Sequence, residues 1–388
     1  MNRISTINKE LSGLATIAFL FLAVNLASCG GGSSGGGSGG PGGGGPGGGG
    51  GPSISSVLYV ASGNNGAGEI LAFTVDSNTG ALSTATSFPG PQFLYELKGD
   101  PSGKFLYGSD FDAGAVRVYS VNSMTGSLTE VTGSPFTAPQ VSGNGGPLAV
   151  SPNGKFLFFS NAFGDITTFS NSAGTLTPNG VVVQDVNQPY HFAVDPSGNF
   201  LYVADHSDSS FSVFAIDQTT GALSAVQGSP FGFQSNSEPA GIVIHPNGNF
   251  LYSTLSNSAG VEGILVNRNT GVLSLISGSP WVTTELIPNF VSITPSGSFL
   301  YVSTAGVGAI QAFSIDSIGG GLTAIATFTG GNPTQMVFDP AGKFLYTPYP
   351  ASHEVAMSAI DQNTGALSQP VVVPADSTTG AIAIIPLP

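Results

Sequence analysis

One short phrase recurs seven times along the chain and constrains its fold more than any other feature. A typical copy is FLYVAD at 200–205, in which apolar and aromatic residues lead into a small or polar ending. Its third position is always aromatic, and these residues are Tyr59, Tyr107, Phe158, Tyr202, Tyr252, Tyr301 and Tyr346. A period of about 50 residues with several short apolar runs per unit is typical of β-propeller blades.

The text around each phrase predicts four antiparallel strands. An alternating run such as FAVD precedes it and ends in DPSG or a similar text, whose proline and glycine fit a type I turn. A third run such as FSVFAID follows, and TTGAL then gives a glycine turn into a fourth strand that often closes in GSPF or GSPW. Because glycine and proline interrupt every unit, helices are disfavoured. The predicted fold is an all-β, seven-bladed β-propeller with four antiparallel strands per blade.

The two ends of the repeated region predict how the ring closes. The first unit begins directly at VLYVAS, with no strand before it, whereas the final text GAIAIIPLP has no aromatic phrase after it. Placing residues 381–385 beside residues 57–61 would complete the seventh blade from both ends. Pairing of the C-terminal strand with the N-terminal blade would also cover an otherwise exposed sheet edge.

Residues 1–28 are predicted to be a lipoprotein signal peptide. Basic residues precede an apolar run that ends in L-A-S-C at Cys29, which resembles the lipobox of bacterial lipoproteins. The alternative is a core cysteine at the end of an ordinary helix. Residues 29–52 are then the lipidated Cys29 and a flexible Gly/Ser/Pro-rich tether, and residues 53–388 form the propeller. The expected location is the bacterial cell envelope, on the outer membrane because Gly30 follows the cysteine, with the membrane as a partner through the lipid.

The composition excludes several classes of function. With Lys+Arg 8 against Asp+Glu 22, binding to nucleic acid is disfavoured. A single cysteine excludes a disulfide framework and a thiolate metal site. No cofactor motif is present, and the acidic and histidine residues at Asp110–Asp112 and Asp205–Asp208 lack the further ligands of a metal site. We therefore predict neither a cofactor nor a metal.

The start of each innermost strand of a propeller faces the central channel, so residues aligned there are candidates for chemistry. Counting four back from the residue before each turn proline gives Glu96, Pro147, His191, Gly241, Phe290, Gln335 and Ala381. One residue earlier lie Tyr95, Tyr190 and Asn289. Glu96 and His191 are the candidate catalytic acid/base pair, and Tyr190, Asn289, Gln335 and Tyr95 are candidate ligand-binding channel residues. The alternative is that these groups only line a water-filled channel.

The unit DPSGNFLYVAD…FAIDQTTGALS…GSPF resembles the lactonase family of seven-bladed propellers, which includes 6-phosphogluconolactonase-like and YVTN-type members. The resemblance covers about residues 53–388 and implies the propeller fold. It also implies a D-L-G-x-D-R text after the aromatic phrase. Asp110 and Asp205 match its first residue, but Ala115 and Ser210 stand where the arginine is expected. Without an arginine or lysine at the channel, a phosphorylated substrate is not expected to bind.

Two functions follow from these patterns. The first is a lipid-anchored, extracytoplasmic propeller that binds an unknown small molecule or protein at its face, as a binding or scaffold module with a degenerate channel site. The alternative is a lactonase-like hydrolase of a neutral lactone or sugar derivative, with His191 and Glu96 as acid and base. The enzyme hypothesis requires these two side chains to come within hydrogen-bonding reach, directly or through one water.

Overall fold

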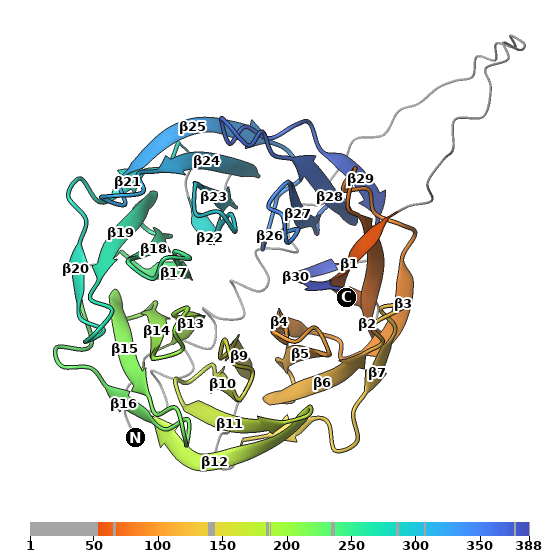
Figure 1. Ribbon diagram of the computed structural model, residues 1–388, viewed down its shortest axis with the longest axis horizontal. Coiled ribbons are helices and arrows are strands. Elements are labelled where there is room, and N and C mark those ends of the chain that lie inside the picture. The colour runs from red at the N-terminus through yellow and green to blue at the C-terminus, as the bar shows by residue number, and fades with distance from the viewer. Residues whose placement is uncertain are drawn as a thin grey trace, which may run out of the picture. The chain divides into compact units, whose positions relative to one another are not determined.

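The computed structural model describes residues 53–387, apart from 65–66, 139–143, 184–185, 187, 234–236, 285–286, 306–307 and 376–377. Within these ranges the named elements are all β-strands, and no helix is long and apolar enough to span a membrane. The strands form seven antiparallel sheets that surround a central axis as blades (Figure 1). The predicted seven-bladed β-propeller is confirmed, whereas the predicted signal peptide, Cys29 and the tether lie outside the described residues.

Each blade places one strand at the centre of the ring and pairs it with a second strand that carries the aromatic phrase (Figure 1). The innermost strands are β4 (Leu94–Gly99), β9 (Gly145–Val150), β13 (Pro189–Val194), β17 (Pro239–Ile244), β22 (Pro288–Ile293), β26 (Val337–Phe338) and β30 (Thr378–Pro386). The second strands are β1 (Ile54–Asn64), β5 (Phe105–Asp110), β10 (Phe156–Asn161), β14 (Phe200–Asp205), β18 (Phe250–Leu255), β23 (Phe299–Thr304) and β27 (Phe344–Tyr349).

A third and an outer strand complete each blade. The third strands are β2 (Ala67–Asp76), β6 (Ala115–Val121), β11 (Ile166–Ser172), β15 (Ser210–Ile216), β19 (Gly260–Val266), β24 (Ala309–Ile315) and β28 (Glu354–Ala359). The outer strands are β3 (Thr86–Gly90), β7 (Leu128–Glu130), β12 (Thr175–Val183), β16 (Leu223–Ala225), β20 (Leu273–Leu275), β25 (Leu322–Thr329) and β29 (Val371–Pro374).

The sequence pattern predicted that the GSPF and GSPW texts end the outer strand, and this prediction is wrong. Two of them form the short strands β8 (Phe136–Thr137) and β21 (Trp281–Val282), which return to pair with the third strands β6 and β19. The outer strands β7 and β20 are only three residues long, so the first half of each third strand has a free edge that this segment covers.

The proline-glycine texts form the predicted turns between the innermost and second strands. In the blade of β13 and β14, Gly198 N–H donates to Asp195 C=O at 2.8 Å, and Gly198 has a φ of 76°, which a residue with a side chain rarely adopts. The Asp195 carboxylate accepts the N–H of Phe200 at 2.7 Å, so it caps the turn at the point where β14 begins.

Closure of the ring follows the predicted pattern. Strand β30 pairs antiparallel with β1, with Ile385 opposite Val57 and Ile382 opposite Val60. The last strand of the chain is therefore the innermost strand of the blade that begins the repeated region (Figure 1). Both isoleucine side chains are buried, with 0% and 2% exposure respectively, so this pairing contributes to the core as well as to the sheet.

The repeated aromatic residue joins neighbouring blades. Tyr252 is fully buried in β18, and its hydroxyl donates to Gly320 C=O of the next blade at 2.7 Å. The same bond from Tyr59, Tyr301 and Tyr346 recurs in three other blades. Tyr202 is equally buried, but its hydroxyl has no hydrogen-bond partner among the described residues. The phrase therefore stabilises the ring through a hydroxyl as well as through its apolar area.

Tyr252 and Tyr202 form a matched pair for measuring this interaction. Tyr252→Phe leaves the Gly320 carbonyl unpaired and is expected to lower the free energy of unfolding by about 1–2 kcal/mol. Tyr202→Phe removes a buried hydroxyl that makes no bond, so a change within about 0.5 kcal/mol, or a small gain, is expected. Urea unfolding of both variants measures the difference, and equal losses would contradict a special role for the inter-blade bond.

Glu262 is a carboxyl group buried in the core with no charged or hydrogen-bonding partner among the described residues. Its side chain in β19 is 0% exposed, and neither carboxylate oxygen has a hydrogen-bond partner within the described part of the chain. The sister residues Arg117 and Ser212 bond to aspartates of their own blades, but Leu255 occupies the corresponding place beside Glu262. Burial raises the pKa of Glu262 from 4.5 to about 7, so the fold favours its protonated form.

The raised pKa of Glu262 predicts that the protein loses stability as the pH rises. Between pH 4.5 and about 7 the folded state keeps a proton that the unfolded state has released, so the free energy of unfolding falls across this window. Glu262→Gln removes this effect and is expected to stabilise the protein by about 2–3 kcal/mol near pH 8 and by almost nothing near pH 4. Urea unfolding at the two pH values tests this, and a pH-independent difference would contradict it.

Candidate active site in the channel

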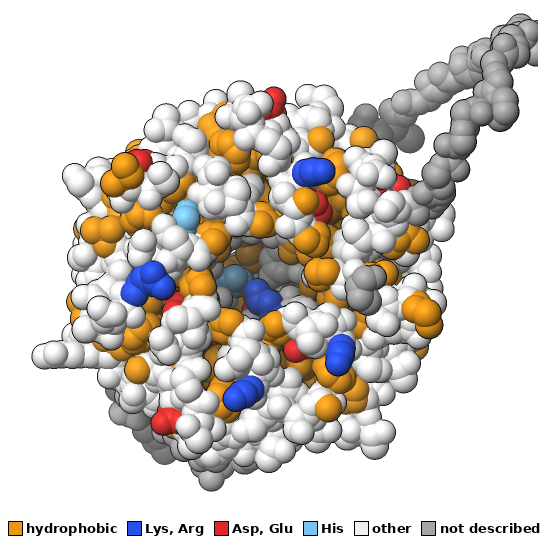
Figure 2. All heavy atoms as spheres, in the orientation of Figure 1, with side chains coloured by type: hydrophobic (Ala, Val, Ile, Leu, Met, Phe, Trp, Pro, Cys, Tyr) orange, Lys and Arg blue, Asp and Glu red, His pale blue; other side chains and the backbone are white. Residues whose placement is uncertain are grey.

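A β-bulge near the start of several innermost strands brings the predicted channel residues to the centre of the ring. The pairing register slips between Leu94 and Glu96 in β4 and between Pro189 and His191 in β13. A bulge re-aims the side chain of the extra residue, which is Tyr95 in the first strand and Tyr190 in the second. The centre of the ring is hollowed there, and basic and histidine side chains line the hollow (Figure 2).

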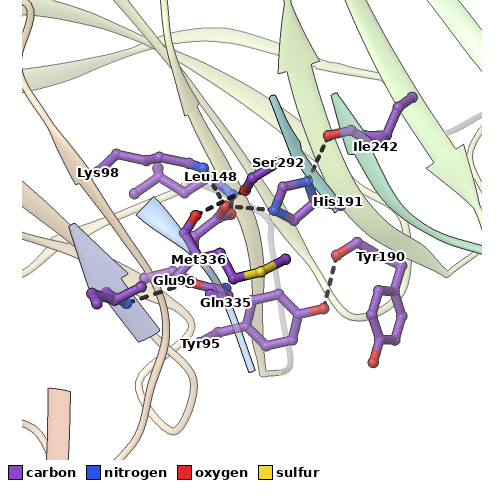
Figure 3. A network of polar contacts seen from close by, with 12 residues as sticks. Tyr95, Glu96, Lys98, Leu148, Tyr190, His191, Ile242, Ser292, Gln335 and Met336 are labelled. Carbon is purple, nitrogen blue, oxygen red and sulfur yellow. Dashed lines mark hydrogen bonds and ion pairs between the residues drawn. The ribbon is translucent and has the colours of Figure 1, made fainter. Parts of the chain in front are cut away.

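Glu96 is the centre of the polar network in this channel (Figure 3). Its Oε1 lies 2.6 Å from Lys98 Nζ and 3.0 Å from His191 Nε2, and its Oε2 accepts the Leu148 N–H at 2.8 Å. The Glu96 side chain itself is 0% exposed. The two predicted catalytic residues therefore meet directly, which is the geometry that the enzyme hypothesis requires.

The charge of Glu96 is fixed by its partners. Burial alone would raise its pKa, but the Lys98 ammonium, the His191 ring and the hydrogen bonds from both outweigh burial and hold the pKa at about 2. Glu96 is therefore a carboxylate at neutral pH. It anchors the Lys98 and His191 side chains and has no proton to donate.

Both ring nitrogens of His191 face acceptors. Nε2 faces Glu96 Oε1, and Nδ1 lies 3.2 Å from the Ile242 carbonyl oxygen in β17. A neutral imidazole has one N–H and can satisfy one of these acceptors, whereas the imidazolium form satisfies both. Both nitrogens are therefore directed at protein acceptors, and neither presents a lone pair to the open channel.

Lys98 is a charged channel residue that the alignment of the repeats did not indicate. It lies two residues beyond Glu96 on the same face of β4. The alignment of the repeats compared the positions of Tyr95 and Glu96 and did not extend to the position of Lys98. The expectation that no lysine or arginine reaches the channel is therefore wrong. The residues at its level in the other blades are uncharged: Ala149, Ala193, Val243, Ser292, Val337 and Ala383. Its side chain is 34% exposed, so part of the ammonium remains available to a ligand.

Glu96 and His191 contact each other although another blade lies between the two blades that carry them. Strand β9 lies between β4 and β13, and it begins with Gly145, Gly146 and Pro147. These short residues put no long side chain into the channel, so Glu96 and His191 can reach each other across it. The Leu148 N–H, at the next residue of β9, supplies the remaining bond to Glu96.

The two predicted tyrosines form a second link between the same blades. The Tyr95 hydroxyl donates to the Tyr190 carbonyl oxygen at 2.9 Å, and the rings meet edge to face at 6.5 Å (Figure 3). Burial raises the pKa of both phenols, so they stay protonated. Tyr190 also stacks on His206, with 5.3 Å between the ring centroids. The tyrosines thus support the channel residues beside them.

Gln335 and Asn289 lie at the predicted level but outside the charged cluster. Gln335 Oε1 accepts the Ile382 N–H at 3.4 Å, which links it to the closing strand. Asn289 offers its backbone carbonyl to Thr254 Oγ1 at 3.1 Å. Among the contacts between described residues, none joins either side chain to Glu96 or His191.

The remaining candidates have structural partners. Arg117 binds Asp110 at 2.8 Å and Glu130 at 2.9 Å, so neither Asp110 nor the arginine is free for a ligand. Within the described part of the chain, no three His, Cys, Asp or Glu side chains are grouped as a metal site.

Comparisons with known proteins place this channel in a family. Residues 53–133, 116–232 and 242–379 match the family described as lactonase, 7-bladed beta-propeller. A 6-phosphogluconolactonase of Formosa agariphila is 31% identical over 128 residues, which cover 31% of this chain and 36% of that protein. A 6-phosphogluconolactonase of Pectobacterium carotovorum is 25% identical over 187 residues, which cover 46% of this chain and 40% of the relative. The matches thus span well under half the length of either relative.

Solved structures share the fold over the whole propeller. A putative 6-phosphogluconolactonase from Bacteroides uniformis superimposes with a TM-score of 0.76 at 20% identity, covering 86% of this chain and 100% of that one. The periplasmic gluconolactonase of Pseudomonas aeruginosa gives a TM-score of 0.72 at 18% identity, with the same coverage. At these identities the likeness concerns the fold alone, while the match to the family covers most of the sequence. The chain therefore belongs to the lactonase family of seven-bladed β-propellers.

Proposed function

We propose that this protein is a lactone hydrolase that opens an uncharged lactone, such as a sugar lactone, in the channel. The observation that carries the proposal is the cluster in which one buried carboxylate, Glu96, holds both Lys98 and His191. A buried ion cluster is costly to build, and a module that only binds a protein at its face has no need of one in the channel. Membership of the lactonase family supports the same choice over the binding or scaffold hypothesis.

The cluster is suited to stabilising the oxyanion of ester hydrolysis. When water attacks a lactone carbonyl, negative charge develops on the carbonyl oxygen. Lys98 has three N–H donors and spends one on Glu96, so it can donate to that oxygen, and His191 lies beside it on the same carboxylate oxygen. Glu96 keeps both side chains in place before the substrate arrives, so little reorganisation is needed in the transition state.

The same residues favour an uncharged substrate over a phosphorylated one. Lys98 is the one basic residue that the described innermost strands contribute to the channel, and its charge is shared with Glu96. Arg117 of β6 is already held by two carboxylates, Asp110 of β5 and Glu130 of β7. Phosphate recognition usually uses a bidentate arginine or several cations, and that second cation is missing from the described channel strands.

Acid release in a pH-stat at about pH 6 tests the proposal. The substrates are glucono-1,5-lactone, its 6-phosphate and a simple γ-lactone, each compared with its spontaneous hydrolysis. We expect acceleration of the uncharged sugar lactone, and a smaller effect on the 6-phosphate. Spontaneous rates for all three lactones would favour the binding or scaffold function instead, and preference for the 6-phosphate would contradict the proposed substrate class.

We also propose that the enzyme works at the bacterial cell envelope, held to the outer membrane by a lipid on Cys29. The L-A-S-C text and the Gly/Ser/Pro-rich residues after it support this location. Radiolabelled palmitate should enter the full chain in a bacterial host, and Cys29→Ser should abolish labelling and release the protein from membranes. Labelling that survives this substitution would contradict the assignment.

A further inference from the structure

The channel cluster lacks a group that can accept a proton from water. Glu96 is a very weak base, since its pKa is held at about 2 and all its short contacts are with donors. His191 has both nitrogens directed at acceptors, and Tyr95 and Tyr190 remain protonated phenols. Ester hydrolysis at neutral pH is usually assisted by a general base, so a hydrolase built on this cluster needs one close by.

His206 stands next to the cluster at the rim of the channel. In the register of β13 and β14, His191 lies opposite Ala204, and His206 is two residues farther toward the rim. The register slips between Pro189 and His191, and the His206 N–H donates to the Gln188 carbonyl oxygen at 3.3 Å, so the bulge residue Tyr190 lies between His191 and the point where His206 meets the chain before β13. The stacking of His206 on Tyr190 at 5.3 Å fixes the ring beside the bulge that carries His191.

Among the described residues, the hydrogen-bond partners of the His206 ring all lie at Nε2 and none at Nδ1. Ser256 Oγ donates its proton to the Glu238 carbonyl oxygen at 2.9 Å, so Oγ can only accept from His206 Nε2, 3.4 Å away. Glu238 Oε2 also faces Nε2, at 3.9 Å. With the proton on Nε2, the lone pair is on Nδ1. This is the arrangement of a histidine that a carboxylate orients for proton transfer.

Burial keeps His206 neutral despite the carboxylates around it. Glu238 faces it from the segment before β17, the Tyr190 ring covers it from β13, Ser256 contacts it from the end of β18, and Asp208 lies on its own turn. Burial lowers the pKa of His206 and outweighs the opposite effect of the Glu238 carboxylate. At neutral pH the ring is therefore a base with an available lone pair.

The position of His206 is also singular within the repeat. The residues that directly follow the aromatic phrase in the described blades are Gly63, Phe111, Ala162, His206, Ser256, Ala305 and Pro350. His206 is the one titratable group in this set. The structural requirements that all blades share therefore do not explain a histidine at this position.

We propose that His206 is the general base of lactone opening, with Glu238 and Ser256 as its positioning residues; this rests on the function proposed above. Water forms the new C–O bond to the lactone carbonyl, and its proton passes to His206 Nδ1. The oxyanion is held at Lys98. As the intermediate collapses, the bond from the carbonyl carbon to the ring oxygen breaks, and that oxygen takes the proton back from His206. The product is the open hydroxy acid, and His206 is regenerated.

The rate of glucono-1,5-lactone hydrolysis against pH tests this assignment in four proteins. His206→Gln should lower kcat by about 100- to 10,000-fold, leave KM within a few-fold, and remove the acidic limb of the profile. His353→Gln, in the equivalent turn of another blade, should behave as the wild type. Glu238→Gln should move the acidic limb to lower pH, because the carboxylate favours protonated His206.

Rescue distinguishes lost chemistry from lost structure. His206→Ala with imidazole in the buffer should regain activity in proportion to the concentration of neutral imidazole. If His206→Gln retains the wild-type kcat and acidic limb, or if folded His206→Ala is inactive and imidazole fails to restore it, the assignment is wrong while the proposed function stands. If the wild type accelerates no lactone, the proposed function falls and this assignment falls with it.

Discussion

Replacing Lys98 by methionine is expected to lower kcat/KM for a sugar lactone by about 100- to 1,000-fold, the usual effect of losing one oxyanion donor. Methionine is close to lysine in length and fills the same space, so the change removes the ammonium with little loss of packing. The ion pair with Glu96 at 2.6 Å is lost at the same time. Glu96 then keeps His191 and the Leu148 N–H as partners, which should keep the carboxylate in place.

The control for this prediction is Lys155→Met. Lys155 lies in an exposed turn between β9 and β10, outside the channel, so its removal changes the net charge of the protein by the same amount. Both variants should unfold cooperatively, with Lys98→Met destabilised by about 1–4 kcal/mol because a buried carboxylate has lost one partner. A folded Lys98→Met protein with the wild-type rate would contradict the role given to the ammonium.

Deleting residues 378–387 is expected to unfold the propeller or to lower its melting temperature by more than about 10 °C. The deletion removes β30, whose Ile382 and Ile385 side chains are buried together with Ala381 and Ala383. Burial of these four side chains corresponds to about 5–8 kcal/mol, which is comparable to the whole stability of many domains. It also leaves β1 as an exposed edge at the centre of the ring.

Two measurements separate loss of the strand from a general effect of truncation. Ile385→Ala should cost about 2–5 kcal/mol, whereas Ile384→Ala, at a partly exposed position of the same strand, should cost clearly less. A synthetic peptide of residues 378–387 should raise the melting temperature of the truncated protein. An unchanged melting temperature after the deletion would show that the ring does not depend on this closure.

The fold could be predicted because every level of the sequence points to the same unit. The aromatic phrase, the proline-glycine turns and the orphan strand at the end are local patterns, and each blade repeats them. Glu96 and His191 could be located for the same reason, since an alignment of the repeats places them at one level of the channel. Where a residue departs from its sister positions, the scaffold does not explain it and chemistry becomes the better explanation.

What could not be predicted depends on contacts between blades. Lys98 could not be predicted because a lysine on a strand usually indicates a solvent-exposed position. Only the contact with Glu96, two residues earlier on β4, shows that its ammonium lies in the channel. The stacking of His206 on Tyr190 joins a turn to a strand, and only the register of β13 with β14 brings them together. Likewise, the isolation of Glu262 follows from Leu255 on the neighbouring strand, which no spacing rule indicates.

The rate of acid release from glucono-1,5-lactone at pH 6, measured side by side for the wild type and Lys98→Met, tests the central claim most directly. If the channel cluster opens lactones, the wild type accelerates the reaction well above the spontaneous rate, and Lys98→Met loses most of that acceleration while remaining folded. Equal rates from the two folded proteins, whether fast or spontaneous, would contradict the claim that this cluster is the active site of a lactone hydrolase.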